Sequence, residues 1–157
     1  MANFVLKAEP GKQDLTITYE LNAPAARVFK AMTDPKLVAQ WWGPRVYETI
    51  VDKLEPKVGG QWRFINRAKD GGEHGFHGVF HLIEAPLRVV QTFEYEGAPG
   101  HVSLESMTLE ERDGKTIVTA HSVFQSTEDR AGMMQGDAME TGARDTYARL
   151  EELLAKG

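Results

Sequence analysis

The sequence predicts an α+β fold in which a curved antiparallel sheet of six to seven strands surrounds a long C-terminal helix. Three observations lead to this prediction. Segments of alternating apolar and polar residues follow one another between residues 46 and 126, separated by tight-turn residues, as in an antiparallel meander. Two short helical segments come after the first strand, and residues 126–157 have the spacing of an amphipathic helix. A strongly twisted sheet curls, so its apolar face is expected to wrap around that helix.

The N-terminal part of the chain predicts one strand and a corner of two short helices. Every second residue is apolar in the first strand, residues 13–21, which indicates one buried face. A helix follows over residues 25–34. The Asp34-Pro35 pair ends this helix, because a residue that precedes proline avoids the helical region. The second short helix covers residues 36–42.

The middle of the chain predicts six consecutive strands. Their expected ranges are 46–56, 61–67, 74–85, 88–96, 101–112 and 115–126. Asp70, Gly71 and Gly72 are the strongest hairpin signal between them. Trp62 and Phe64 share one face of the second of these strands, which marks that face as buried.

The C-terminal segment predicts a short helix followed by a long one. Ser126 precedes Asp129 by three residues, as at a capped helix start, and Gly136 divides the segment. Lys156 and Gly157 suit the end of the long helix. Its small and apolar residues lie on one face, which either completes an ordinary core or covers a ligand cavity: Met139, Gly142, Ala143, Thr146, Tyr147, Leu150, Leu153 and Leu154.

Length and composition indicate one globular domain over residues 1–157, with a core over about 13–155. Hydrophobic residues make up 41% and charged residues 26%, and the net charge of −5 disfavours nucleic acid as a partner. Because the chain has no cysteine, disulfides and thiol catalysis are excluded. No apolar run is long enough to insert into a membrane, and the N-terminus lacks a signal-peptide core, so we expect a cytoplasmic protein.

The sequence predicts neither a metal site nor a cofactor. His74, His77 and His81 lie on a predicted strand, where residues four apart are about 13 Å from each other, too far for one ion. The glycine pairs 59–60 and 71–72 lie in turns between strands and do not open a helix, so they are poor phosphate sites.

Two residues are candidates for acid–base chemistry, and no nucleophile motif is present. Glu105 shares a strand face with Ser103 and Met107, so it is either a polar group pointing inward or a charge on the sheet surface. His121 belongs to the last strand. It points outward if Ser122 marks the inward face.

Aromatic residues occur in nearly every predicted element. Such a lining, with a few polar groups, is typical of a small-molecule pocket and equally of an ordinary core. These aromatic residues are Trp41, Trp42, Trp62, Phe64, Phe80, Phe93, Tyr95, Phe124 and Tyr147.

Five segments resemble one family, the homologues of the activator of heat-shock-protein ATPase. The family belongs to the START-like (SRPBCC) superfamily, which includes polyketide cyclases, plant hormone receptors and lipid-transfer domains. The resemblance covers about residues 13–155. Its segments are PKLVAQWWGP (35–44), GGQWRF (59–64), residues 78–94, TLEERDGKT (108–116) and the final helix.

The resemblance implies the helix-grip fold, with a cavity between the sheet and the long helix that takes hydrophobic small molecules. It also implies which positions line that cavity, with Trp41 at its gate. The others are Trp62, Phe64, Gly78, Phe80, Phe93, Met107, Phe124, Met134, Met139, Ala143 and Tyr147. The superfamily's enzymes use different pocket residues, so no catalytic set is carried over.

Three functions remain open at this stage. The first is a protein that binds a hydrophobic or aromatic small molecule, without enzyme activity. The second is a cyclase, dehydratase or hydrolase that uses Glu105 or His121. The third is a protein-interaction module of the co-chaperone kind. The eukaryotic activator carries a separate chaperone-binding domain for which this chain has no room, so chaperone contact is not implied. A homodimer is compatible with all three.

Overall fold

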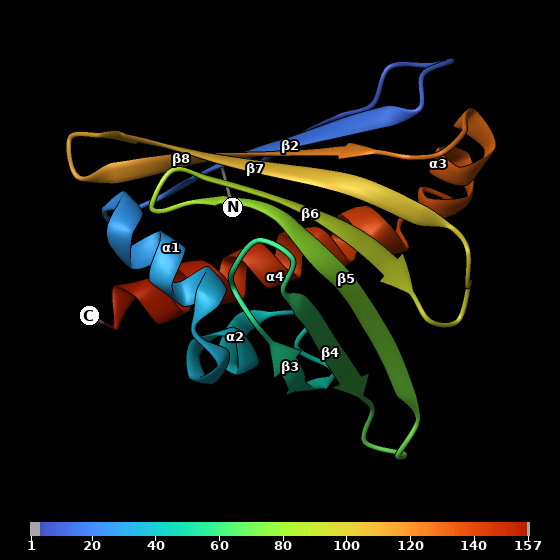
Figure 1. Cartoon of the computed structure of the whole chain (residues 1–157), viewed down its shortest axis with the longest axis horizontal. Helices are drawn as coiled ribbons and strands as arrows, with labels where there is room; N and C mark the ends of the chain where they lie inside the picture. The colour runs from blue at the N-terminus through green and yellow to red at the C-terminus, as the bar shows by residue number, and fades with distance from the viewer. Residues whose placement is uncertain (1–3, 157) are drawn as a thin grey trace.

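The computed structural model describes residues 4–156 and has the predicted α+β helix-grip architecture (Figure 1). All strands belong to one antiparallel sheet of eight strands, in the order β1-β2-β8-β7-β6-β5-β4-β3. The strands are β1 (Val5–Lys7), β2 (Asp14–Leu21), β3 (Glu48–Leu54), β4 (Gln61–Arg67), β5 (Glu73–Glu84), β6 (Arg88–Tyr95), β7 (Val102–Arg112) and β8 (Lys115–Val123).

The sheet has eight strands where the sequence predicted six to seven, because of β1. This strand is only three residues long and pairs with β2 through Val5 opposite Thr18. Three residues are too few to show a strand period, so only the pairing reveals it. The two short helices therefore follow the second strand.

Four helices accompany the sheet: α1 (Ala25–Thr33), α2 (Pro35–Trp41), α3 (Thr127–Met133) and α4 (Ala138–Ala155). Asp34 ends α1 and begins α2, and its Oδ1 accepts a hydrogen bond of 2.9 Å from the amide of Lys36. The expected cap of α3 is present, since Ser126 Oγ accepts a hydrogen bond of 3.0 Å from the Asp129 amide. Gly157, expected at the end of α4, lies outside the described residues.

The helix α4 crosses the concave side of the sheet, with α1 and α2 near its C-terminal end and α3 near its N-terminal end (Figure 1). Gly136 has a φ of +69°, a conformation that glycine adopts without strain, and it separates α3 from α4. Only Leu150 and Leu154 of α4 are fully buried, and both lie in its C-terminal half. The core is therefore densest at the α1–α2 end.

Two arginines join α4 to the segment that follows α2. Arg149 Nη1 donates a hydrogen bond of 2.6 Å to the carbonyl of Gly43, and its Nη2 donates one of 3.0 Å to the carbonyl of Gln40. Arg45 forms ion pairs with Asp145 at 2.8 Å and with Glu152 at 2.9 Å. These contacts fix the position of the helix over the sheet.

Candidate functional site

A cavity of about 190 Å³ lies between the concave face of the sheet and α4, on the side of α3. Its wall is mostly apolar, with a few polar groups, as is usual in small-molecule sites. The strands provide Leu15, Ile17, Val89, Gln91, Phe93, Ser103, Glu105, Ser106, Met107, Ala120 and Ser122, and the rest of the wall is Phe124, Met133, Met139 and Tyr147.

A second chamber of about 470 Å³ adjoins this cavity on the side of α3. The two chambers share Phe93, Ser103, Phe124 and Met133, so they form one inner and one outer compartment. The outer chamber is also lined by the β6–β7 loop and by residues of α3. The two chambers therefore adjoin at these four residues.

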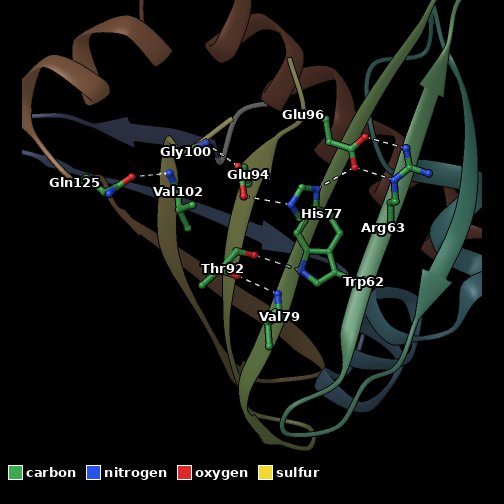
Figure 2. Close-up of polar contacts among 10 residues, drawn as sticks. All are labelled: Trp62, Arg63, His77, Val79, Thr92, Glu94, Glu96, Gly100, Val102 and Gln125. Carbon is green, nitrogen blue, oxygen red and sulfur yellow. Dashed lines mark hydrogen bonds and ion pairs between the residues drawn. The ribbon is translucent and has the colours of Figure 1, made fainter. Parts of the chain in front are cut away.

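The rim of the outer chamber is formed by the β6–β7 loop and by α3. The amide of Val102 donates a hydrogen bond of 2.7 Å to Gln125 Oε1, which ties the end of the loop to the segment before α3 (Figure 2). His101 Nδ1 lies 2.9 Å from Asp129 Oδ1, and this contact links the loop to α3 directly. Both contacts set the width of the rim.

A row of three polar side chains crosses the floor of the inner chamber. Gln91 of β6 pairs in register with Glu105 of β7, which pairs in turn with Ser122 of β8. Ser122 Oγ donates a hydrogen bond of 3.3 Å to Glu105 Oε2. Side chains alternate between the two faces of a strand, so Ser103 and Met107 point the same way as Glu105.

Glu105 is the ionisable group inside the cavity. Burial beneath the sheet and α4 raises the pKa of its carboxyl to about 7, and the hydrogen bond from Ser122 offsets a part of that effect. A carboxyl with this pKa can take up or release a proton near neutral pH.

Tyr147 of α4 lies on the other side of the inner chamber. Burial raises the pKa of its phenol, and the nearby Glu105 carboxylate raises it further. The phenol therefore stays protonated at physiological pH and can donate a hydrogen bond into the cavity.

The structure brings five of the twelve expected binding residues to the inner chamber. They are Phe93, Met107, Phe124, Met139 and Tyr147. Met134 and Ala143 are partly buried and pack against the core, outside the chamber lining. Their helical spacing is correct, but they face the neighbouring core.

The other expected residues pack in the opposite half of the concave face, where the interior is filled. Trp62 lies 4.8 Å from Phe64 between ring centroids, and Trp42 lies 5.0 Å from Phe64 and 5.2 Å from Phe76. Phe80 is also buried in this core. Large rings fill the interior there, whereas the smaller residues near Glu105 leave space open.

Trp41 and Gly78 were also expected to line the cavity, and both have structural roles elsewhere. Trp41 is 4% exposed, and its Nε1 donates a hydrogen bond of 2.8 Å to the carbonyl of Ala31, so it joins α2 to α1 and is no gate. A side chain at Gly78 would overlap the carbonyl oxygen of Thr92 and come within 2.6 Å of Trp62 Nε1. The glycine therefore permits close packing of β5.

His121 does not lie in the cavity. Its Nε2 is 2.9 Å from Asp14 Oδ2 on the outer face of the sheet, where both side chains are about 40% exposed.

The lining residues that the sequence did not predict are mainly small or polar, among them Gln91, Ala120 and Ser122. The feature of the sequence that could have identified them is the series of small side chains at inward-facing strand positions.

The outer face of the sheet carries a polar network (Figure 2). Arg63 forms a two-pronged contact with Glu96, at 2.7 and 2.8 Å, and the guanidinium lowers the pKa of Glu96 to about 2. His77 lies between Glu96, at 2.9 Å, and Glu94, at 3.2 Å. Its contacts are satisfied within the network, which binds β4, β5 and β6 together.

The described residues were also compared with the requirements of a metal site and of a membrane-spanning helix. Within residues 4–156, no group of three or more His, Cys, Asp or Glu side chains is placed to hold a metal ion. No helix in the same range is long and apolar enough to cross a membrane.

The sequence matches the family model of "Activator of Hsp90 ATPase homolog 1-like protein" over residues 22–155. The chain belongs to this family. Membership agrees with the helix-grip fold and with the START-like superfamily, and it supports a ligand-binding domain in general terms. Comparison with curated proteins gave no significant match.

Solved structures of similar proteins confirm the fold. A protein from Arthrobacter aurescens is 25% identical with a TM-score of 0.88, and the match covers 98% of this chain and 92% of that one. A protein from Rhodobacter sphaeroides is 23% identical with a TM-score of 0.87, over 98% of this chain and 100% of that one.

A more distant match is DynU16, a protein in the dynemicin biosynthetic locus. It is 20% identical with a TM-score of 0.69, and the match covers 92% of this chain but only 48% of DynU16. At this identity the match shows a shared fold alone.

Proposed function

We propose that the protein binds a small hydrophobic or aromatic molecule in the inner chamber. The observation that carries this proposal is the chamber itself, about 190 Å³ of space walled by Phe93, Met107, Phe124, Met139 and Tyr147. A dense core excludes voids of this size, so a space kept open beside a filled aromatic core supports occupation by a ligand.

The small side chains on the floor of the chamber support the same proposal. Ser103, Ala120 and Ser122 occupy inward strand positions where larger residues would close the space. The adjoining outer chamber gives a ligand a route from the solvent. Family membership supports ligand binding in the same general sense.

The test uses 2-(1-naphthyl)ethanol, a neutral aromatic probe, and isothermal titration calorimetry. We expect saturable binding of one molecule per chain. The variant Ala120→Leu extends a side chain into the inner chamber and is expected to weaken binding at least about tenfold, because overpacking a filled space is unfavourable.

The matched control is Thr119→Leu, one residue earlier on β8 and on the opposite face of the strand. It should leave the affinity unchanged. Absence of saturable binding to the wild-type protein, or equal binding by the Ala120→Leu variant, refutes the proposal. If the wild-type protein binds the probe and Ala120→Leu weakens binding, native mass spectrometry of protein from its own host is the measurement that identifies the natural ligand.

A second candidate is an enzyme that transfers a proton to or from its bound substrate. The observation that favours it is the Glu105 carboxyl inside the chamber, whose pKa is raised to about 7 by burial. A general base works best when its pKa lies near the operating pH. Such a base removes a proton from carbon next to a carbonyl, and the carboxyl returns it or exchanges it with water.

This candidate is tested with 2-tetralone, an aromatic ketone, in deuterated buffer. Exchange of its α-protons, followed by NMR, should be accelerated by the wild-type protein and not by Glu105→Gln. The variant must still bind 2-(1-naphthyl)ethanol, which shows that its chamber is intact. Equal exchange rates with both proteins would exclude Glu105 as the base.

The cytoplasmic location expected from the sequence remains a prediction. A homodimer and a chaperone contact are both compatible with the sequence, which implies neither of them. Expression with a fluorescent tag and analytical ultracentrifugation are the measurements that address the location and the homodimer.

A further inference from the structure

We infer that the ligand of this chamber is a cationic amphiphile: a protonated amine that lies against Glu105, joined to an apolar body. This inference rests on the proposed function, since it concerns the same chamber. It goes further by assigning the charge of the ligand's polar end. Two features of the chamber determine this charge: the charged groups in its wall, and the lack of a cationic partner for Glu105 among the described residues.

The first observation is that Glu105 has no cationic partner within the described residues. It takes part in none of the ion pairs of residues 4–156, and its hydrogen bond there comes from the neutral Ser122. Two other partly buried carboxylates of the fold do have a cationic partner: Glu96 contacts Arg63 at 2.7 Å, and Asp145 contacts Arg45 at 2.8 Å. Glu105, which lines the inner chamber, has no such partner among these residues.

The second observation concerns the charge of both chambers. Their lining contains three carboxylates, Glu105 inside and Glu128 and Asp129 toward the outside, and no Lys or Arg among the described residues. The basic side chain at the rim is His101, whose Nδ1 lies 2.9 Å from Asp129 Oδ1. A cleft lined by charges of one sign attracts ligands of the opposite sign and repels like-charged ligands.

The third observation is the polar row on the floor. Gln91 and Ser122 flank Glu105 on the neighbouring strands, in register with it. Val89 and Ala120 lie two residues away on the same strands and also line the chamber. A ligand with one polar end and one apolar body therefore matches the wall, because the polar groups are gathered at one place.

These observations favour an ammonium group over a hydroxyl or a carboxylate. A buried carboxylate is costly unless a charge or several donors face it, and an ammonium supplies both. A hydroxyl supplies one donor without charge. A ligand carboxylate would place two negative groups together in a site of low polarity.

The test compares three probes with one aromatic body: 2-(1-naphthyl)ethylamine, 2-(1-naphthyl)ethanol and 1-naphthylacetic acid. Their affinities are measured by calorimetry at about pH 8, where the Glu105 carboxyl is largely ionised. The amine should bind about tenfold or more tighter than the alcohol, since hydrogen bonds to charged groups are the stronger ones. The acid should bind most weakly.

The variant Glu105→Gln keeps the shape of the side chain and removes its charge. It should bind the amine no more tightly than the alcohol, whereas the wild type prefers the amine. Circular dichroism and a cooperative thermal unfolding transition show that the variant is folded. The control Glu84→Gln, an exposed carboxylate outside both chambers, should retain the full preference for the amine.

Two results would overturn the inference while leaving the proposed function in place. One is binding of the alcohol that equals or exceeds binding of the amine. The other is a preference for the amine that persists in Glu105→Gln. Failure of all three probes to bind the wild-type chain would instead refute the proposed function, and the inference with it.

Discussion

The rings of Tyr19 and Tyr147 stack beside the inner chamber, with centroids 3.9 Å apart and planes inclined by 22°. Tyr19 belongs to β2 and is completely buried, whereas Tyr147 belongs to α4 and lines the chamber. The pair therefore joins the core to the site. Its contact holds the middle of α4 to the sheet, one turn before the first fully buried residue of the helix, Leu150.

The hydroxyl of Tyr19 leads to the first prediction. Its oxygen is buried and has no hydrogen-bond partner among the described residues. An unsatisfied buried polar group costs about 1–3 kcal/mol, so Tyr19→Phe should raise the free energy of unfolding by about 1 kcal/mol. Urea denaturation measures this change. A loss of stability would instead mean that the hydroxyl has a partner in solution, such as a bound water or ligand.

Glu105 leads to the second prediction, which concerns pH. The folded protein holds the pKa of this carboxyl at about 7, above the value of 4.5 that is ordinary for a glutamate, so folding favours the protonated form. The contribution of this carboxyl to the free energy of unfolding is fully present below about pH 4.5 and is lost as the pH rises through about 7. The loss at high pH amounts to at most about 3 kcal/mol, by the usual conversion of pKa differences.

The variant Glu105→Gln should therefore be more stable than the wild type at about pH 8.5 and gain much less at about pH 5. Urea midpoints at the two pH values measure the difference. The exposed Glu84→Gln is the control and should leave the pH dependence as it is in the wild type. Parallel pH profiles for the wild type and Glu105→Gln would show that the carboxyl is solvated in the folded state.

The elements of the fold could be predicted from the sequence because their signals are local. The alternation of Leu15 to Leu21 and the three-four spacing after Met139 each mark an element without knowledge of the rest. The strand β1 gave no such signal, since its three residues acquire their structure by pairing with β2.

The site could be predicted only in part, for a different reason. Strand alternation shows that Trp62 and Phe93 both point inward, but not which of them lies beside open space. That depends on whether neighbouring strands bring large rings or small side chains to the same place. The ring of Trp42 packs against Trp62, whereas the small Ser103 beside Phe93 leaves space open.

Gly78 leads to the third prediction. An alanine there would place its Cβ against the Thr92 carbonyl and 2.6 Å from Trp62 Nε1, which donates a hydrogen bond of 3.3 Å to that same carbonyl (Figure 2). Backbone and a fully buried indole cannot both move aside at low cost. Gly78→Ala should therefore lower the free energy of unfolding by about 1–3 kcal/mol.

The control for this prediction is Gly132→Ala in α3, where an added Cβ meets nothing within 4 Å. Alanine is the better helix former, so this variant should be neutral or more stable by up to about 1 kcal/mol. Thermal unfolding followed by circular dichroism compares the two. Equal effects at both positions would contradict the close packing of β5 against β6 and Trp62.

Arg149 leads to the last prediction, which concerns the attachment of α4. Its guanidinium donates to the carbonyls of Gln40 and Gly43, and burial lowers its pKa, so the cation depends on these acceptors. Arg149→Ala leaves carbonyls at the end of α2 without their donors and should cost about 1–3 kcal/mol of unfolding free energy. Arg149→Lys should recover only a part of this loss, because an ammonium lacks the planar fork that spans two carbonyls.

The matched control is Arg45→Ala, which removes exposed ion pairs to Asp145 and Glu152 and should cost less than Arg149→Ala. The salt dependence of the stability loss distinguishes the two variants further. Added sodium chloride should shrink the effect of Arg45→Ala and leave that of Arg149→Ala, since screening acts on exposed charge pairs more than on hydrogen bonds to carbonyls. Urea denaturation at low and high salt measures both effects. If Arg45→Ala proves the more damaging, the ion pairs rather than the α2 carbonyls hold α4 over the ligand chamber.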